Sequence, residues 1–374
     1  MRVRAAVLEA MGAAPPYAES RPLRIQEVEL DPPGPGEVLV RIAAAGLCHS
    51  DLSVINGDRP RPLPMVLGHE AAGIVEEVGP GVDDLARGDH VVLVFMPSCG
   101  HCLPCMEGRP ALCEPGAVAN GAGTLLSGAR RLRRDGEPVN HHVGVSAFAE
   151  YATVSRRSLV KIDPELPLDE AALFGCAVLT GAGAVINTAG VRPGQTVAVV
   201  GLGGVGLCAL LAAVASGARE IVAVDLLPEK LAFARQLGAT VTFDARDERV
   251  AEAIREATRG GVDFAFELAG SAKALELAWA ITRRGGTTIT AGLPHPSARL
   301  PVPIVQLVAE ERALKGSYIG TAVPARDVPR LIDLFRKGRL PVDRLMSGRF
   351  SLDEINEGFD RLARGQAIRQ IVTF

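Results

Sequence analysis

Several features that would narrow the function of a chain are rare or missing here. In 374 residues, 40 Lys and Arg stand against 43 Asp and Glu, which gives a formal net charge of −3. Lysine is scarce among the basic residues, and we attribute this to coding bias rather than to function. Because no excess of positive charge is present, neither nucleic acids nor anionic membranes are expected as partners.

The chain also lacks a long apolar run. The longest weakly apolar stretch, Ala171–Ile186, is interrupted by three glycines and a threonine, whereas a bilayer-spanning helix needs about 20 apolar residues. The first ten residues contain two arginines, but Glu9 interrupts the apolar core that a signal peptide needs, so we expect no signal peptide. The expectation is therefore a cytoplasmic protein without a membrane partner.

A disulfide framework is not expected either, because the chain is large and has an odd number of cysteines, seven. Four of them have the spacing C-x2-C-x2-C-x7-C: Cys99, Cys102, Cys105 and Cys113. Four thiolates at this spacing can close a tetrahedron around Zn2+, which predicts a structural zinc lobe over residues 97–115. An iron–sulfur cluster is the alternative. His101 lies within the lobe and is expected to face solvent.

What the sequence does contain is a glycine-rich turn between a predicted strand, Thr196–Val200, and a predicted helix, Leu207–Ser216. Gly201, Gly203 and Gly206 form G-x-G-x-x-G, which is typical of the turn that receives the pyrophosphate of a dinucleotide. The alternative is a glycine-rich turn in an unrelated α/β protein.

An acidic residue strengthens the dinucleotide interpretation. The next predicted strand, Glu220–Val224, is followed by Asp225, 19 residues after Gly206. An acidic side chain at this distance holds the ribose 2′-hydroxyl of NAD. Cys208 lies in the apolar helix after the turn and is expected to be a core residue.

The order of the predicted elements indicates an α/β fold with two domains. The N-terminal third has short predicted strands separated by Pro and Gly: Arg2–Leu8, Ile25–Leu30, Glu37–Ala44, 88–94 and Phe148–Val154. From about Val178, predicted strands alternate with helices, as in a doubly wound sheet: Thr196–Val200, Glu220–Val224, Thr240–Phe243, Val262–Glu267, Thr287–Ala291 and Leu314–Ile319.

The chain ends with two predicted helices, Asp327–Lys337 and Leu352–Arg364, and a strand, Ile368–Phe374. The expected domains are 1–177 with 320–374, and 178–319. The polar segment Glu114–Asn140 has four arginines that are expected to form a solvated face: Arg130, Arg131, Arg133 and Arg134.

Together these motifs resemble the zinc-dependent medium-chain alcohol dehydrogenase family. Other segments contribute to the resemblance: Cys48-His-Ser-Asp51, Gly68-His-Glu70 with Gly73 and Gly79, Gly175-Cys176 and Ile368–Phe374. The resemblance implies a β-rich, GroES-like catalytic domain and a Rossmann coenzyme domain. The long segment Glu114–Asn140 is similar to that of the liver-type and glutathione-dependent formaldehyde dehydrogenase branches.

The resemblance also implies a catalytic zinc held by Cys48, His69 and Cys176. Three protein ligands would leave a fourth position for water or substrate. Taken singly, each of these residues would be interpreted as part of the core. Ser50 resembles the hydroxyl that accepts the substrate proton. Two carboxylates complete this set: Asp51, which would orient the histidine ligand, and Glu70, which can approach the metal.

Coenzyme and substrate contacts follow from the same resemblance. His49 and Arg369 would contact the pyrophosphate of NAD. Thr180 and Val205 would pack against its nicotinamide, and Lys230 would lie near its adenosine ribose. The implied substrate pocket is mostly apolar: Phe95, Val118, His142, Val143, Leu293 and Ile319. Ser53 stands where many members have a relay histidine, so water or His49 would have to end the proton relay.

The function implied is reversible oxidation of an alcohol to an aldehyde or ketone, with NAD and two Zn2+ per chain, in a homodimer or a tetramer. One alternative is an NAD-dependent dehydrogenase of S-(hydroxymethyl) thiol adducts (a formaldehyde dehydrogenase), for which Arg59 at the pocket rim would be a carboxylate-binding group. Another is a dinucleotide-binding protein without catalytic activity, although zinc-free relatives of that kind lack the Cys48, His69 and Cys176 trio.

Overall fold

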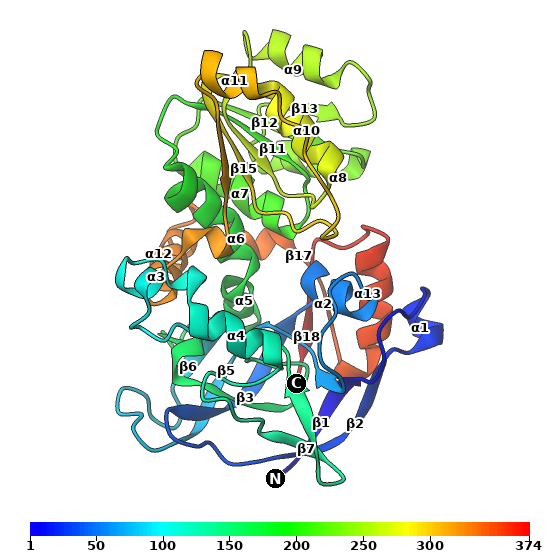
Figure 1. Ribbon diagram of the computed structural model, residues 1–374, viewed down its shortest axis with the longest axis vertical. Helices are drawn as coiled ribbons and strands as arrows, with labels where there is room; N and C mark the ends of the chain where they lie inside the picture. Colours follow the sequence, from blue (N-terminus) through cyan, green and yellow to red (C-terminus); the bar gives the residue numbers. More distant parts are fainter. The chain divides into compact units, whose positions relative to one another are not determined.

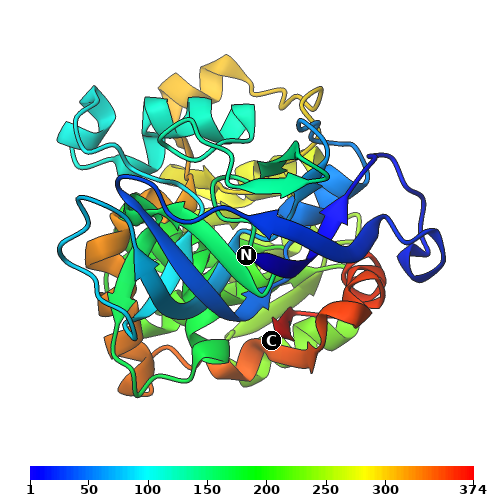
Figure 2. The same ribbon diagram turned by 90° about the horizontal axis from the view of Figure 1, so that it is seen from below.

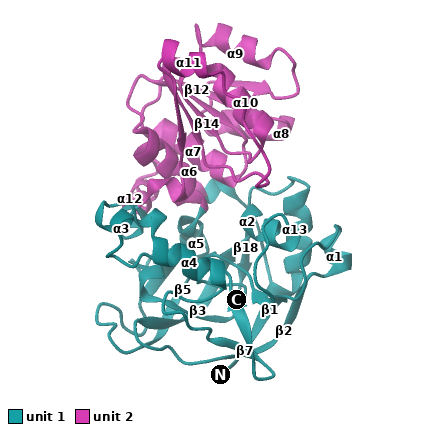
Figure 3. Ribbon diagram, in the orientation of Figure 1, with its two compact units in different colours: residues 1–176, 323–329, 343–374 teal, residues 177–322, 330–342 magenta.

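A computed structural model describes all 374 residues (Figures 1 and 2). The chain divides into two compact units, shown in different colours in Figure 3. Unit 1 contains residues 1–176, 323–329 and 343–374, and unit 2 contains residues 177–322 and 330–342. A β-rich unit and a unit with a parallel sheet and helices confirm the expected fold class.

Unit 1 contains most of the strands and both chain termini. Its strands are β1 (Arg2–Leu8), β2 (Leu23–Leu30), β3 (Glu37–Gly46), β4 (Met65–Val66), β5 (Glu70–Val78), β6 (His90–Val94), β7 (Leu132–Arg134), β8 (Glu137–His141), β9 (Tyr151–Ser155), β10 (Leu159–Ile162), β17 (Met346–Phe350) and β18 (Arg369–Thr373). Its helices are α1 (Tyr17–Ser20), α2 (His49–Ile55), α3 (Leu103–Met106), α4 (Glu114–Ala122), α5 (Leu168–Ala172) and α13 (Ile355–Ala363), with short 3-10 turns η1 (Pro110–Leu112), η2 (Arg156–Ser158), η3 (Leu173–Gly175), η6 (Val342–Leu345) and η7 (Leu352–Glu354).

Two sheets make the framework of unit 1. Strands β1, β2, β7, β8 and β4 close a small barrel, and the pairing of β1 with β2 is visible in blue in Figure 2. The other sheet has the order β10-β6-β5-β3-β18-β17, with β9 also paired to β3. Because β3 lies in the interior of this sheet, most of its residues are buried. The last strand of the chain thus completes the sheet that the first third begins.

Unit 2 has a six-stranded parallel sheet of order β13-β12-β11-β14-β15-β16. The strands are β11 (Thr196–Val200), β12 (Glu220–Asp225), β13 (Val241–Asp244), β14 (Val262–Glu267), β15 (Thr282–Thr290) and β16 (Ala313–Gly316). The helices are α6 (Ala177–Gly183), the π-helix η4 (Ala184–Ala189), α7 (Gly204–Ala215), α8 (Pro228–Gln236), α9 (Val250–Ala257), α10 (Ala272–Ile281) and α11 (Ile304–Ala309), with the 3-10 turn η5 (Ile319–Thr321). All residues of β11 are buried, as expected for an interior strand of a parallel sheet.

The division into units differs from the expected boundaries at Ala177, at residues 320–322 and at residues 330–342, all of which belong to unit 2. Helix α12 (Pro324–Arg336) has residues in both units, and residues 330–342 belong to unit 2 rather than to the catalytic part. The reason is local packing, because Arg330 and Leu334 line one surface hollow together with Ile186 and Val191. Sequence periodicity shows the helix but not the neighbours of each half.

The predicted last strand of the sheet, Leu314–Ile319, is too long at its C-terminal end. Strand β16 ends at Gly316, and the chain then turns through η5. Ile319 and Gly320 both have positive φ angles, of 48° and 63°, which no strand adopts. A side chain at Gly320 would collide with the carbonyl oxygen of Leu179, so the tight approach to α6 requires glycine.

The arginine-rich segment is not the solvated face that the sequence indicated. It begins with α4 and continues into the β7–β8 hairpin, which belongs to the barrel. Arg131 Nε donates to the buried Glu37 carboxylate over 2.7 Å, and Arg133 Nε donates to Asp31 over 3.1 Å. Arg134 pairs with Glu9. The charges therefore attach the hairpin to β3 and to the residues that directly follow β1 and β2.

No single helix is long and apolar enough to cross a bilayer, and only the bent pair Leu168–Gly175 with Ala177–Ala189 meets that test by length and composition.

Candidate active site and metal centres

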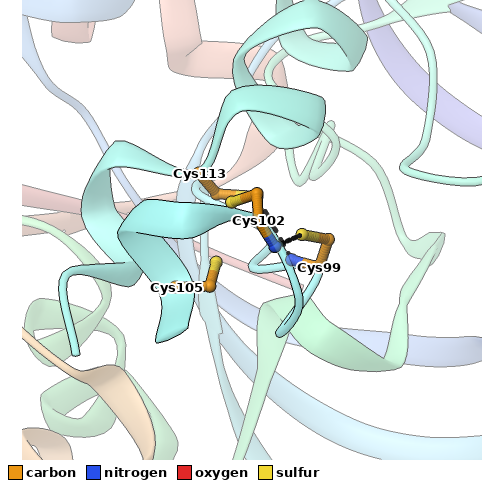
Figure 4. A group of neighbouring side chains, drawn as sticks. All are labelled: Cys99, Cys102, Cys105 and Cys113. Carbon is orange, nitrogen blue, oxygen red and sulfur yellow. Dashed lines mark hydrogen bonds between the residues drawn. The ribbon is translucent and has the colours of Figure 1, made fainter. Parts of the chain in front are cut away.

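The four clustered cysteines come together around the short helices that follow β6 (Figure 4). Cys102 precedes α3, Cys105 lies on α3, and Cys113 precedes α4, so two helix starts and one loop bring the sulfurs together. All four sulfur atoms lie within 4.8 Å of one another. This is a donor set that fits a closed tetrahedral zinc site. The His101 side chain is exposed, and its Nδ1 lies 3.0 Å from the Cys99 carbonyl oxygen.

Backbone N–H groups donate to two of these sulfurs, but of these two only Cys99 has a lowered pKa; burial raises the pKa of Cys113, and it raises that of Cys105 to about 12. Cys99 Sγ accepts from the N–H of His101 and of Cys102, over 3.5 and 3.3 Å, and Cys113 Sγ accepts from Gly116 over 3.4 Å. Burial alone raises the pKa of the Cys99 thiol, but the two N–H groups more than offset it and lower the pKa to about 7. A thiolate is the form that binds a metal.

A second metal-ligand cluster lies in the core of unit 1. Cys48, His69, Glu70 and Cys176 offer ligand atoms within 4.8 Å of one another, and all four side chains are buried. Cys48 precedes α2, His69 immediately precedes β5, Glu70 is the first residue of β5, and Cys176 follows η3. The fold thus collects residues from three distant segments, as the family resemblance implied.

The environment of His69 tests whether a metal fits this cluster. Its Nδ1 lies 3.0 Å from Asp51 Oδ1, while its Nε2 is buried without any hydrogen-bond partner. An unpartnered buried ring nitrogen is costly unless something else binds it. One imidazole nitrogen and two sulfurs around a shared point form the ligand set of an open zinc site. The residues present therefore fit a zinc ion.

Asp51 fixes the orientation of His69. Its fully buried carboxylate accepts from the N–H groups of Cys48 and Gly68 over 3.3 and 3.2 Å, in addition to its contact with His69. Burial alone raises the pKa of Asp51, but the neighbouring histidines more than offset it and hold the pKa below its usual value. A carboxylate that holds the second nitrogen of a ligand histidine sets the ring tautomer and raises its basicity.

His142 is buried beside the Asp51 carboxylate, and its expected contact with substrate stays a prediction. It is 2% exposed, and its Nδ1 lies 3.2 Å from Asp51 Oδ1. Its ring also stands edge-on to that of His69, with the centroids 5.6 Å apart. His142 therefore faces the carboxylate behind the metal cluster. Local spacing could not reveal this, because 91 residues separate His142 from Asp51.

Glu70 forms a buried ion pair with Arg369 of β18. Burial raises the pKa of Glu70 to about 7, although the Arg369 guanidinium offsets part of the effect. The Arg369 guanidinium is thus directed at the metal cluster from the last strand, and its contact with a pyrophosphate stays a prediction. Glu70 Oε1 has no hydrogen-bond partner, and one oxygen of the Glu70 carboxylate lies within 4.8 Å of the Cys48 and Cys176 sulfurs.

Helix α2 presents three polar residues just after Cys48. His49 is exposed, Ser50 is half-buried, and the Ser53 hydroxyl donates to the His49 carbonyl over 2.8 Å. The Ser53 hydroxyl therefore donates to the backbone of its own helix, and the group that ends the proton relay stays a prediction.

The expected pocket residues fall into different environments. In unit 1, Phe95 stands edge-on to His69 at 5.3 Å, and Val143 is buried, whereas Val118 of α4 is 72% exposed. Val118 is therefore exposed on this chain, and its contact with substrate stays a prediction. In unit 2, Ile319 is buried and Leu293 is 52% exposed.

The glycine turn of unit 2 has the geometry of a dinucleotide site. Gly201 has φ +96°, and an added Cβ would lie 2.7 Å from Ala269. A Cβ on Gly206 would collide with the Gly201 carbonyl oxygen, so helix and turn pack directly. A Cβ on Gly203 would meet nothing within 4 Å. This open space lies at the N-terminus of the 12-residue α7, where backbone N–H groups attract phosphate.

Asp225 is the last residue of β12 and hydrogen-bonds to the glycine turn. Its carboxylate accepts from Leu202 N–H over 2.7 Å and from Leu227 N–H over 3.1 Å. Thr180 and Val205 are neighbours in unit 2, because Gly181 packs against the Val205 carbonyl so closely that a side chain would not fit. Lys230 is half-buried in the first turn of α8.

Comparison with known proteins covers nearly the whole chain. Residues 34–164 match the alcohol dehydrogenase GroES-like domain, and residues 204–337 match the zinc-binding dehydrogenase family. An alcohol dehydrogenase zinc-binding domain protein from Burkholderia ambifaria is 39% identical with a TM-score of 0.94, over 100% of this chain and 99% of the other. Benzyl alcohol dehydrogenase from Acinetobacter calcoaceticus is 35% identical with a TM-score of 0.93, over the same shares.

A zinc-binding dehydrogenase from Sinorhizobium meliloti 1021, whose structure contains NADP, is 28% identical with a TM-score of 0.81 over the full length of both chains. Two family matches and an identity of 39% along the full length agree with the two cysteine clusters and the glycine turn. The chain belongs to the zinc-dependent medium-chain alcohol dehydrogenase family.

Proposed function

We propose that this protein oxidises an apolar alcohol to the aldehyde or ketone, reversibly, with transfer of a hydride to NAD+. The observation that supports this most strongly is the buried cluster of Cys48, His69 and Cys176, in which His69 Nε2 has no partner. These three residues would hold a catalytic zinc, and the four cysteines of the lobe would hold a structural one. A zinc ion, when bound, is a Lewis acid that lowers the pKa of an alcohol.

The remaining residues of unit 1 would orient and deprotonate the substrate. Asp51 holds His69 in the tautomer that leaves Nε2 free for the metal. Ser50 would accept the substrate proton, because its half-buried hydroxyl lies two residues after Cys48. Ser53 is engaged with its own helix, so the proton would pass from Ser50 to water or to His49.

The choice of NAD over NADP rests on Asp225. Its carboxylate lies at the end of β12 next to the glycine turn, and the residues after it, Leu226 and Leu227, supply no positive charge for a 2′-phosphate. A close carboxylate–phosphate pair is repulsive, and this would favour NAD. The NADP of the S. meliloti structure supports a nicotinamide coenzyme in general. We propose the same coenzyme contacts for His49, Arg369 and Lys230 as the family resemblance implies.

The proposed substrate class is aromatic or medium-length aliphatic alcohols. The 35% identical relative acts on benzyl alcohol by its name. Phe95 stands edge-on to His69 and supplies an apolar surface beside the metal cluster. Benzyl alcohol is therefore the first substrate to test.

A substrate panel tests this function. We expect kcat/KM with NAD+ to be highest for benzyl alcohol and 1-hexanol, lower for ethanol, and undetectable in the Cys176→Ser variant. S-(hydroxymethyl)glutathione is included because Arg59 could recognise its carboxylates. A higher kcat/KM for this adduct than for any free alcohol would replace the proposed substrate class with the formaldehyde dehydrogenase alternative.

We also propose a homodimer, with helix α11 in the contact surface. Three apolar side chains of α11, Ile304, Val305 and Val308, are between 69% and 77% exposed, and β16 is the edge strand of the parallel sheet. Exposed apolar groups beside an open strand edge favour association. Sedimentation at micromolar concentration should give a dimer that Val305→Glu with Val308→Glu dissociates, whereas Val118→Glu does not. A monomeric wild type would refute this proposal, and a tetramer would require a second contact surface.

A further inference from the structure

Glu267 is a buried carboxylate that the proposed chemistry does not use. It is the last residue of β14, which is labelled in Figure 3, and it is 1% exposed. Its Oε1 accepts from three consecutive backbone N–H groups, those of Ala269, Gly270 and Ser271, over 2.9, 2.6 and 3.3 Å. One carboxylate oxygen thus holds the whole loop that follows β14.

The same residue also holds the loop after the neighbouring strand. Oε2 accepts from the Thr290 hydroxyl over 2.7 Å, and the Glu267 carbonyl accepts from the N–H groups of Ala291 and Gly292 over 3.1 and 3.3 Å. A Cβ on Gly292 would lie 2.7 Å from Oε2, so the second loop passes directly over the carboxylate. All donors to the carboxylate are uncharged.

These loops lie beside the proposed dinucleotide turn. In the sheet, Glu267 is paired with Val200, the residue before Gly201, and Leu268 N–H donates to the Val200 carbonyl over 2.9 Å. Gly201 packs against Ala269 so closely that a Cβ would lie 2.7 Å away. The loop held by Glu267 is therefore a wall of the glycine turn. In open parallel sheets, ligands bind at this carboxyl edge of the strands.

We propose that Glu267 is a positioning residue for the dinucleotide coenzyme, through the loops Leu268–Ser271 and 291–293. This inference rests on the proposed function. Without the carboxylate, three partly buried N–H groups would lose their common acceptor, and both loops would gain conformational freedom. The coenzyme would then have to order them on binding, which weakens affinity. Sequence reasoning could have noticed Glu267 as a second acidic residue at a strand end, after Asp225.

The competing interpretation is a purely structural role, in which loss of Glu267 lowers stability alone. Asp263 provides a matched control on the same strand. Its carboxylate accepts from Thr196 N–H over 2.7 Å and pairs with Arg283, but it lies at the amino end of β14. Asp263→Ala should lower the melting temperature of the protein and leave the affinity for NADH unchanged.

The experiment measures the Kd of NADH by fluorescence, together with zinc content and kcat. Glu267→Ala should raise the Kd and the KM for NAD+ by about tenfold, with unchanged zinc and a smaller change in kcat at saturating coenzyme. Glu267→Gln should rescue the Kd to within about threefold, because its amide oxygen can accept from the N–H groups and its nitrogen can donate to Thr290.

Two results would overturn the inference: a folded Glu267→Ala variant with the Kd of the wild type, or an equal loss of affinity in Asp263→Ala. If Glu267→Ala does not fold, Thr290→Val removes a single donor and should raise the Kd by about threefold, and an unchanged Kd there would also overturn it. If the wild type binds neither NADH nor NADPH, the proposed function is wrong, and the inference about Glu267 is wrong with it.

Discussion

We predict that His141, a histidine outside both metal clusters, makes the folded protein less stable against unfolding as the pH falls. This residue is at the end of β8 and is fully buried. Its Nε2 accepts from Arg131 N–H over 3.0 Å, so the proton of the neutral ring is on Nδ1, which has no partner. Burial, assisted by the positive charges of Arg130 and Arg131 and opposed by Glu37, lowers the pKa of His141 from 6.5 to about 4.

The sign of the effect follows from linkage. Between pH 6.5 and pH 4 the unfolded chain binds a proton at His141 and the folded chain does not, so stability falls as pH falls. Each pH unit in this window costs about 1.4 kcal/mol, which amounts to about 2 kcal/mol by pH 5 and about 3 kcal/mol at the lower end. Above pH 6.5 the histidine contributes no pH dependence.

The measurement compares urea unfolding of the wild type and His141→Gln at pH 7.5 and pH 5. The glutamine oxygen can still accept from Arg131 N–H but does not titrate. The single tryptophan, Trp279, belongs to unit 2, so far-UV circular dichroism is used to include unit 1. The wild type should lose about 2 kcal/mol more than the variant over this interval. Equal losses in the two proteins would refute the reasoning, because acid sensitivity of other groups is common to both.

The remaining predictions concern the metals and the coenzyme. Metal analysis should find about two zinc ions per chain; Cys105→Ser should lower thermal stability, whereas Cys176→Ser should abolish activity with little change in melting, and one zinc in the active enzyme would contradict this. Comparing kcat/KM for the two coenzymes should give on the order of a hundredfold preference for NAD+, which Asp225→Gly should narrow chiefly by weakening NAD+ binding; equal values in the wild type would exclude this role of Asp225. Asp51→Asn should release zinc to a chelator at concentrations about 10- to 100-fold lower, and His142→Phe should have a smaller effect in the same direction; unchanged zinc affinity in Asp51→Asn would disprove the orienting role.

Local sequence was sufficient wherever neighbouring residues decide the geometry. The strand, turn and helix around Gly201, Gly203 and Gly206 follow from φ angles and close packing that only glycine permits, and the structure has these elements close to where the sequence indicated them. The spacing of Cys99 to Cys113 likewise brings four sulfurs together, because 15 residues can fold around one point.

Charge and periodicity did not predict contacts between side chains that are distant in the sequence. The arginines of the β7–β8 hairpin have the composition of a solvated surface, yet Arg131 pairs with Glu37, 94 residues away. The strand β17 was not expected, because Met346–Phe350 contains a serine, a glycine and an arginine and no β-branched residue, a composition that does not indicate a strand.

The sequence alone therefore determined the classes of chemistry: a four-sulfur lobe, a dinucleotide turn with an acidic residue after it, and a parallel-sheet domain. The tertiary structure decided which side chains meet. It placed His142 beside Asp51, paired Arg369 with Glu70, and brought Cys48, His69 and Cys176 together from three segments. The physical reason is that backbone preferences are local, whereas the partner of a buried polar group is set by whichever distant strand the core packing brings next to it.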